Sequence, residues 1–445
     1  MTPDSSILIA GAGTFGLSTS YHLAKAGYKN ITVLEKSPTI PSHLSAGNDL
    51  NKILRAEYED AFYTELALQA MREWKDNGLF APHYHETGYL LCTSAAAPEK
   101  SKRTLAKSLS SVSSHPAFQG GEGQGGHKII CPINTRDDIR AVAPALDGPM
   151  QGWTGYLNRF AGYAHAADAL RAMHAACCAL GGVTFRLGDG VTALVYSNGD
   201  DAQPKGVCIG ARTASGAVHT ADVVVLALGA ALGTVLGGPH GVGRHVAARA
   251  WSVGHVQLSE DEASRLRRIP VTYARDLGFF FEPDARTRLL KVCPAGAGYT
   301  NFVSGEEGRE EETAPVSVSV PPEDSGWIPA RDEAMIRRLL RETLPALADR
   351  PIVDKKLCWC ADTADTDYII DFVPGKGRVV VVSGDSGHAF KMLPVVGNWV
   401  KDVLEKGRQD IPRWRWKEGQ DAGGDVSWRV GESIDIKDVK ETVRG

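Results

Sequence analysis

The chain has 445 residues, which is long enough for two domains and a sizeable core. Its charged fraction of 23% is ordinary for a globular protein, and its net charge of −4 gives no reason to expect nucleic acid or an anionic membrane as a partner. No apolar run is long enough to cross a bilayer, and the eight cysteines are too few for a disulfide scaffold. A cytoplasmic location is expected, and a peroxisomal one stays open although the chain does not end in an S-K-L tripeptide.

The N-terminal segment carries the clearest pattern in the chain. Residues 6–10 are a short apolar run typical of a buried strand, and the sequence G-x-G-x-x-G follows at once over residues 11–16. Residues 17–26 read as a helix, and residues 31–34 as a second strand that ends on Glu35. Strand, glycine turn, helix, strand and acid together predict a dinucleotide-binding unit.

Each glycine of this motif, and the acid after it, has a physical role. Gly11 would make the tight turn, Gly13 would let a pyrophosphate approach the backbone, and Gly16 would let helix and strand pack closely. The free N–H groups at the helix start would hold the phosphates. Glu35 could accept both ribose hydroxyls, although the motif does not separate FAD from NAD.

The next segments should lead into a second domain. The loop over residues 37–52 would pass beside the isoalloxazine ring if the fold binds a flavin. Residues 57–77 are strongly amphipathic and predict a helix, and residues 87–93 predict a strand. The segment 94–126, rich in Ser, Lys and Gly, predicts a surface helix followed by a flexible loop, because no strand precedes its glycines.

The middle of the chain should return to the nucleotide-binding domain. An Ala-rich helix is expected over residues 164–180. The buried run 222–228, which ends on Gly229, is expected to lie beside the first strand, as in doubly wound flavin domains. Further strands are expected at residues 183–185, 191–196, 206–212 and 251–258.

The last third should supply a pocket and a second unit of strand, loop and helix. Residues 278–283 and 289–293 look like strands of a sheet over a pocket, and residues 334–344 form an amphipathic helix. Residues 378–383 are an apolar strand, and a Gly-rich loop then leads to a helix over residues 395–406. The N-terminus of that helix is expected to face another anionic atom.

Five short motifs carry a resemblance to a known family. The chain resembles the fungal fructosyl amino acid and fructosyl peptide oxidases, the amadoriases, within the wider sarcosine oxidase group. The matching stretches are SAGNDLNK at 45–52, GFFFEPD at 278–284, GYTN at 298–301, CWCADTAD at 358–365 and GDSGHAFK at 384–391. The matches keep the order of the family, whereas the segment 94–127 and the tail match poorly.

The resemblance implies an α/β protein with a glutathione-reductase-type FAD domain and an α+β substrate domain whose antiparallel sheet lies over the flavin. The FAD domain would comprise residues 1–58, 153–240 and 350–410, the substrate domain residues 59–152 and 241–349, and the C-terminal tail residues 411–445. The family's enzymes oxidise the C–N bond of a secondary amine by hydride transfer to the flavin, which O₂ reoxidises to give H₂O₂. A monomer is implied.

Several functional alternatives stay open at this point. The substrate implied is a fructosyl amino acid or peptide, or another N-substituted amino acid such as pipecolate or saccharopine. A tailoring oxidase for an N-alkylated metabolite is an alternative of the same fold. A non-catalytic flavin-holding protein and an NAD dehydrogenase are competing classes, which flavin bleaching by an amine and a colourless protein, respectively, would separate.

The resemblance also assigns roles to single residues. It implies a thioether bond from the 8α position of FAD to Cys358, O₂ activation by Lys291 or Lys52, and contacts from Lys391 and His388 to the flavin or substrate. The expected catalytic residues are therefore Lys291, Lys52 and Lys391. With the nucleotide motif, the expected cofactor contacts are Gly11, Gly13, Thr14, Phe15, Gly16, Glu35, Lys36, Ser45, Asn48, Lys52, Gly229, Cys358, Asp385, Gly387, His388 and Lys391. No metal is expected.

One departure from the family concerns the substrate. In amadoriases a glutamate four residues past the Lys291 equivalent pairs with an arginine near the C-terminus, and the pair holds the amino acid part of the substrate. Here that position is Ala295, and Arg429 is near the expected arginine but not in register. The carboxylate clamp is therefore expected to be altered or absent, which leaves secondary-amine oxidation as the implied reaction but changes the implied substrate.

Overall fold

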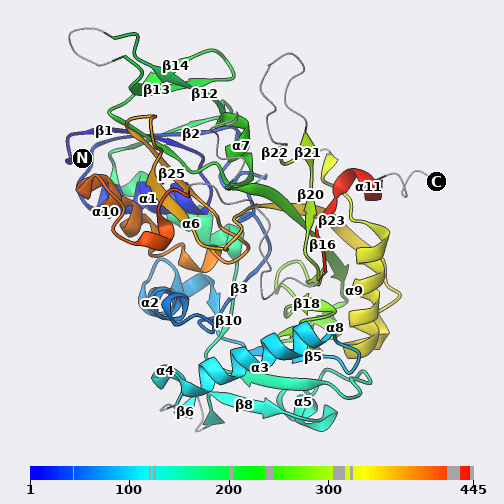
Figure 1. The fold of residues 1–445 in the computed structure, drawn as a ribbon. Helices are drawn as coiled ribbons and strands as arrows, with labels where there is room; N and C mark the ends of the chain where they lie inside the picture. Colours follow the sequence, from blue (N-terminus) through cyan, green and yellow to red (C-terminus); the bar gives the residue numbers. More distant parts are fainter. Residues whose placement is uncertain are drawn as a thin grey trace.

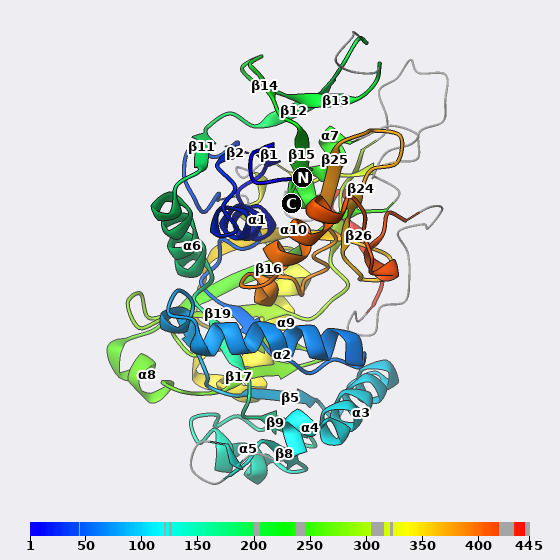
Figure 2. The ribbon, with the colours of Figure 1, turned by 90° about the vertical axis from the view of Figure 1, so that its left-hand side faces the viewer.

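Two large β-sheets organise the protein, one above the other in Figure 1. The structure is a computed structural model that describes residues 1–43, 45–119, 122–123, 127–199, 205–236, 245–303, 316–320, 324–417 and 431–440. A six-stranded sheet lies in the upper half and a ten-stranded sheet in the lower half. Helix α2 (Ala61–Asp76) crosses the view of Figure 2 at the height of the ten-stranded sheet.

The six-stranded sheet is a parallel sheet with one antiparallel edge strand. Its order is β11-β2-β1-β15-β25-β24, and only β24 runs antiparallel to its neighbour. The predicted first unit is confirmed as β1, α1 and β2, and the chain returns as β15 beside β1, as expected. The strands are β1 (Ser6–Ala10), β2 (Asn30–Glu35), β11 (Val183–Leu187), β15 (Val223–Leu226), β24 (Ile369–Phe372) and β25 (Val379–Ser383).

Both faces of this sheet are buried, which explains why its central strands are continuously apolar. Ile7 and Ile9 of β1 pack on the helix side, where α1 (Thr14–Lys25) contacts α6 (Ala166–Leu180) and α10 (Val396–Lys406). The alternate residues of β1 belong to a second core, which includes side chains from a small antiparallel sheet. That sheet is formed by β12 (Val191–Tyr196), β13 (Cys208–Thr213) and β14 (Val218–Thr220).

The ten-stranded sheet is mostly antiparallel and spans the lower domain. Its order is β26-β20-β16-β19-β18-β17-β5-β9-β8, and β23 pairs with β16 off this path. The strands are β5 (Tyr89–Thr93), β8 (Ile130–Ile133), β9 (Thr154–Asn158), β16 (Ala247–Gln257), β17 (Val271–Ala274), β18 (Gly278–Phe280), β19 (Leu289–Pro294), β20 (Tyr299–Thr300), β23 (Ile352–Asp362) and β26 (Ile434–Asp435). Antiparallel β18 and β19 confirm the predicted sheet at 278–293.

Helices cover this sheet, and short strands connect the two halves. The helices of this half are α3 (Glu99–Ser114), α4 (Pro116–Gln119), α5 (Arg136–Val142), α8 (Glu260–Arg265) and α9 (Ala330–Thr343). A three-stranded sheet of β3 (Lys52–Leu54), β10 (Gly162–Ala164) and β4 (Tyr84–His85) joins segments far apart in the chain. The remaining short elements are β6 (Glu122–Gly123), β7 (His127–Lys128), β21 (Phe302–Val303), β22 (Val316–Ser317), α7 (Leu232–Val235) and α11 (Ile436–Lys440). In the described residues, no helix is long and apolar enough to cross a membrane.

The expected domain boundaries stay a prediction, but two strands inside the expected FAD-domain ranges belong to the ten-stranded sheet. All six strands of the upper sheet fall within 1–58, 153–240 and 350–410. However, β9 and β23 also fall within those ranges, and both belong to the lower sheet. Since β23 carries Cys358, this residue reaches the site from the sheet of the second domain.

The structure differs from the sequence-based expectations at the start of α2 and around the N-terminus of α10. The helix expected from residue 57 begins at Ala61, because the Asp60 side chain accepts from the Phe62 amide and caps it. The Gly-rich loop after β25 does not open directly into α10, since a 3₁₀ turn over Phe390–Met392 intervenes. The amide of Gly397 in the first turn of α10 donates to Ser18 Oγ of α1, so the prediction of an anion-facing terminus there is wrong. The loop expected after α3 lies partly outside the described residues.

Candidate active site

Two cavities meet between the sheets. The first, here called the nucleotide groove, runs along the glycine turn after β1 and the end of β2. The second, here called the inner chamber, lies between β3, β18, β19 and β23. Both cavities are lined by Lys52, Cys360, Gly387 and Phe390, so these residues mark the passage from one to the other.

The glycine turn has the shape that a pyrophosphate requires. Gly11 has a φ of 98°, and a β-carbon there would overlap the carbonyl of Ala227. A β-carbon at Gly16 would overlap the carbonyl of Gly11, so this glycine allows the close packing of turn and helix. Helix α1 begins at Thr14 after Gly13, and no side chain of the described residues caps it. Its first amides can therefore bind an anion.

Glu35 lies where the ribose of a dinucleotide is expected. It is buried in the nucleotide groove at the end of β2. Its Oε2 accepts from the Ala12 amide at 2.9 Å, and its Oε1 accepts from the Ser37 amide at 2.9 Å. Each carboxylate oxygen has a further lone pair, so the acid is held in place and can still accept from hydroxyl groups.

Most other expected cofactor contacts line the same groove. These are Thr14, Phe15, Lys36, Ser45, Gly229, Asp385 and Gly387. Asn48 is an exception, since it lines neither cavity and its carbonyl accepts from Lys356 Nζ at 3.1 Å. Trp359 was not foreseen: it lines the groove, and its buried Nε1–H has no partner in the described part of the chain. A buried donor without a partner beside the glycine turn fits a bound dinucleotide.

The inner chamber contains an unforeseen carboxylate that gathers three lysines. Asp49 is fully buried, and its Oδ2 lies 2.5 Å from Lys291 Nζ and 2.8 Å from Lys52 Nζ. Lys356 Nζ lies 3.6 Å from the other oxygen. Burial alone would raise the pKa of Asp49, but the three positive charges hold it well below its usual range. Lys291 and Lys52, both expected catalytic residues, therefore share one counter-ion.

Cys358 and Cys360 lie on the same face of β23, two residues apart. A hydrogen bond from Cys360 and the charge of Lys52 together lower the pKa of Cys358 to about 5, against the effect of burial. Lys52 Nζ lies 3.8 Å from the Cys358 sulfur. The Cys358 side chain therefore favours the thiolate, which is the nucleophilic form of cysteine.

The opposite wall of the chamber carries two further cations, Arg55 and Lys391. Lys391 Nζ donates to the hydroxyl of Tyr58 at 2.6 Å and to the carbonyl of His388 at 3.2 Å. Burial, with the charge of Arg55, lowers the pKa of Lys391 well below its usual value. Arg55 donates to the carbonyl of Glu57. Neither cation forms an ion pair with a carboxylate among the described residues.

His388 and Asp385 lie beside these cations. The Nδ1 of His388 lies 3.2 Å from the hydroxyls of both Tyr58 and Tyr368, and its Nε2 lies 2.8 Å from the carbonyl of Thr366. The ring therefore positions Tyr58, which in turn contacts Lys391. Burial raises the pKa of Asp385 to about 6, although it accepts from the amides of Ala361 and Gly387.

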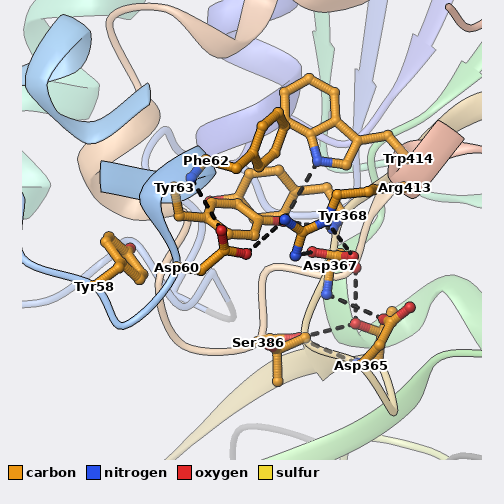
Figure 3. Close-up of polar contacts among 12 residues, drawn as sticks. Tyr58, Asp60, Phe62, Tyr63, Asp365, Asp367, Tyr368, Ser386, Arg413 and Trp414 are labelled. Carbon is orange, nitrogen blue, oxygen red and sulfur yellow. Dashed lines mark hydrogen bonds and ion pairs between the residues drawn. The ribbon is translucent and has the colours of Figure 1, made fainter. Parts of the chain in front are cut away.

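The part of the chamber where the family's clamp would lie is apolar. Ala295 lines it together with Pro294, Gly296 and Trp251. Arg429 lies outside the described residues. Arg413, an arginine of the tail, is engaged elsewhere: it forms two bonds to Asp367, at 3.0 and 2.9 Å, and one to Asp60 (Figure 3).

A parallel sheet with this glycine turn, an acid at the end of its second strand and an adjoining basic chamber define a dinucleotide-dependent oxidoreductase. Residues 6–403 match the family of FAD dependent oxidoreductases, and the chain belongs to that family. L-saccharopine oxidase of Schizosaccharomyces pombe is 32% identical over 98% of both chains.

Solved structures agree with this assignment. Fructosamine oxidase (Amadoriase II) of Aspergillus fumigatus has 33% identity and a TM-score of 0.82, with 99% of this chain and 97% of that chain covered. Fructosyl peptide oxidase of E. terrenum has 30% identity and a TM-score of 0.85, with 99% and 98% covered. The resemblance to amadoriases and the expected FAD-type α/β fold are therefore confirmed.

Proposed function

We propose that the protein is a monomeric FAD-dependent oxidase that oxidises the C–N bond of a secondary amine in an N-substituted amino acid. The observation that carries this proposal is the pair of cations Arg55 and Lys391 in the inner chamber. Neither forms an ion pair with a carboxylate in the described part of the chain, although the charge of the buried Glu57 acts on both. Since an unpaired buried charge is unfavourable, the pair favours a ligand that brings its own carboxylate.

FAD, when bound, would take a hydride from the substrate carbon beside the amine and pass its electrons to O₂, which yields H₂O₂. The residues that would hold it are the glycine turn, Glu35 and Trp359 in the groove, with Cys358 forming a thioether. The low pKa of Cys358 supports this covalent bond, because the thiolate is the form that attacks carbon. Lys291 would supply a fixed positive charge for O₂ reduction.

The substrate class is narrowed by Ala295. A methyl group lines the chamber where amadoriases carry a glutamate, so no acid side chain at this position can bind an arginine or a substrate ammonium. Relatives named for saccharopine and for fructosamine are about equally similar, at 32% and 33% identity, so the preference for an N-substituted amino acid of the saccharopine type rests on Ala295. The substrate carboxylate would then be held by Arg55 and Lys391 instead of by the family's clamp.

The test is anaerobic mixing of the yellow protein with N-substituted amino acids, followed by the loss of visible flavin absorption. We expect bleaching by a saccharopine-type amino acid, release of H₂O₂ in air, and weak reaction with a fructosyl amino acid. Replacing the α-carboxylate by a carboxamide should raise the apparent Kd roughly 10–100-fold, the range for a charged hydrogen bond. Flavin that no N-substituted amino acid bleaches would rule out the oxidase.

A variant series separates the carboxylate contact from general damage. Arg55→Met should remove most of the preference for the acid over its carboxamide, and Arg55→Lys should keep part of it. The matched control is Arg286→Met, since Arg286 pairs with Asp168 on the surface and is 70% exposed. A preference unchanged in Arg55→Met would show that another cation binds the carboxylate.

A further inference from the structure

A crevice lies behind the wall that carries Arg55. It shares Arg55, Tyr58 and His388 with the inner chamber, so these side chains face both spaces. Its far side is formed by Arg275, which follows β17, and by Ser108 of α3. Helix α3 contributes Ser108 to this lining, and the other lining residues come from segments far apart in the chain.

Arg275 is held rigidly in this crevice but is not neutralised. Its amide donates to the carbonyl of Cys92 at 2.9 Å, which fixes the backbone. Its guanidinium donates to Thr104 Oγ1 at 3.0 Å and to Ser108 Oγ at 2.6 Å. It forms no ion pair with a carboxylate in the part of the chain that the structure describes, and its buried Nε–H has no partner there. Two hydroxyls thus orient a guanidinium whose charge is left uncompensated.

The acids that line the same crevice are already paired with other cations. Arg413 binds Asp60, as Figure 3 shows, and Lys417 forms an ion pair with Asp365. Arg413 also stacks on Phe62, with its guanidinium carbon 4.8 Å from the ring centroid. Glu59 is the remaining acid of the lining, and it is exposed to solvent. The charge of Glu57 acts on Arg55, whereas Arg275 forms no ion pair in the described residues, so Arg275 is the side of the crevice that lacks a counter-ion.

We propose that Arg275, oriented by Thr104 and Ser108, binds a second, distal carboxylate of the substrate. This inference rests on the proposed function and deepens it: the substrate is an N-substituted amino acid that carries an additional carboxylate on its longer arm. One carboxylate lies in the chamber with Arg55 and Lys391, and the arm passes the Arg55–Tyr58 wall to reach Arg275. The planar guanidinium suits this task because it donates two parallel hydrogen bonds to a carboxylate.

The charges on both sides of the wall support this path. Arg55 lies with its guanidinium carbon 4.9 Å from the Tyr58 ring centroid and 5.9 Å from that of Tyr89. The charges of Arg55 and Arg275 both act on Tyr89, where they oppose the burial that raises its pKa. Tyr58 lines both spaces, so the chain of an extended dicarboxylate would lie along its ring between the two arginines.

The experiment compares a substrate that carries the distal carboxylate with a matched substrate in which that group is a primary amide. Apparent Kd and the limiting rate of flavin bleaching are measured without oxygen on wild type, Arg275→Met and Ser108→Ala. In Arg275→Met we expect the Kd of the acid to rise roughly 10–100-fold, with little change for the amide or in the limiting rate. Ser108→Ala should raise the Kd of the acid by a smaller factor. Because it keeps the arginine, it still tests the assignment if Arg275→Met fails to fold.

Two controls test whether the effect is specific to Arg275 and whether the bound carboxylate belongs to the substrate. Arg341→Met, which removes an arginine that is 58% exposed on α9, should leave both substrates unchanged. Calorimetric titration with glutarate tests whether the crevice binds a free dicarboxylate. If Arg275→Met abolishes glutarate binding while wild type shows no preference for the acid substrate over its amide, the crevice binds a separate anion and not the substrate arm. Equal losses for acid and amide would overturn the assignment. Failure of every amine to bleach the wild-type flavin would instead refute the proposed function.

Discussion

Asp49→Asn isolates the electrostatic role of the buried acid in the chamber. The amide has nearly the same shape as the carboxylate, so the substitution removes a charge without opening a cavity. Lys291 Nζ and Lys52 Nζ lie 2.5 and 2.8 Å from one oxygen of Asp49, and the side chain has no exposure. In the variant both ammonium groups stay near each other with no anion between them.

The expected loss follows from these distances. Removing one partner of a buried ion pair typically destabilises a protein by about 3–5 kcal/mol. Two ammonium groups about 5 Å apart repel by roughly 3 kcal/mol at an effective dielectric constant of about 20, which is of the same order. Asp49 raises the pKa of Lys52 well above its ordinary value against the effect of burial, so Lys52 should lose this support and release its proton at a lower pH.

The assay is urea unfolding of wild type and Asp49→Asn across a range of pH. The pKa of Asp49 is held below its usual range in the fold, so its contribution is complete above the unfolded pKa of about 4 and is lost as pH falls through the folded value. The difference in unfolding free energy should therefore be largest near neutral pH and shrink in acid. Asp349→Asn, an acid whose side chain is 87% exposed, should change stability by less than about 1 kcal/mol. A difference for Asp49→Asn that is equally small, or constant with pH, would refute the reasoning.

Three further predictions concern the flavin and the substrate. Acid precipitation should release flavin from Cys358→Ser but not from Cys360→Ser, and equal retention in both variants would contradict the thioether assignment. Lys291→Met should slow reoxidation of the flavin by O₂ about 10²–10³-fold while changing its reduction by amine far less, and stopped-flow traces with normal reoxidation would leave Lys52 as the candidate. Ala295→Glu should not improve kcat/KM for a fructosyl amino acid, because it adds a buried charge without its arginine; a clear gain would show that a cation already lies opposite.

The sequence predicted those features that depend on neighbouring residues. The strand, glycine turn and helix at residues 6–25 follow from local apolar periodicity and from backbone conformations that glycine permits. The position of Cys358 in the chamber followed from a motif of eight residues. The same local reasoning predicted the start of α10 to within one residue, but it did not reveal the 3₁₀ turn over Phe390–Met392 in the loop before it.

The features that the sequence did not reveal depend on contacts between distant residues. Asp49 and Lys291 are 242 positions apart, and no periodicity links them. The unpartnered indole N–H of Trp359 is visible only when every neighbouring acceptor is known. Arg55 directly follows the three-residue strand β3, where one arginine beside apolar neighbours gives no signal of its charge environment. In the sequence, the available hint for Asp49 was its position three residues before Lys52.

The distribution of charge explains why these long-range contacts decide what the chamber can bind. On one side Asp49 pairs with Lys291, Lys52 and Lys356, and one acid for three lysines leaves a fixed positive field in the chamber. On the other side burial and then the charge of Arg55 lower the pKa of Lys391, because the protonated amine is repelled by the guanidinium. A bound carboxylate relieves that repulsion, whereas a neutral ligand leaves it in place. The lysine side therefore suits electron transfer to an acceptor, and the arginine side suits recognition of an acidic substrate.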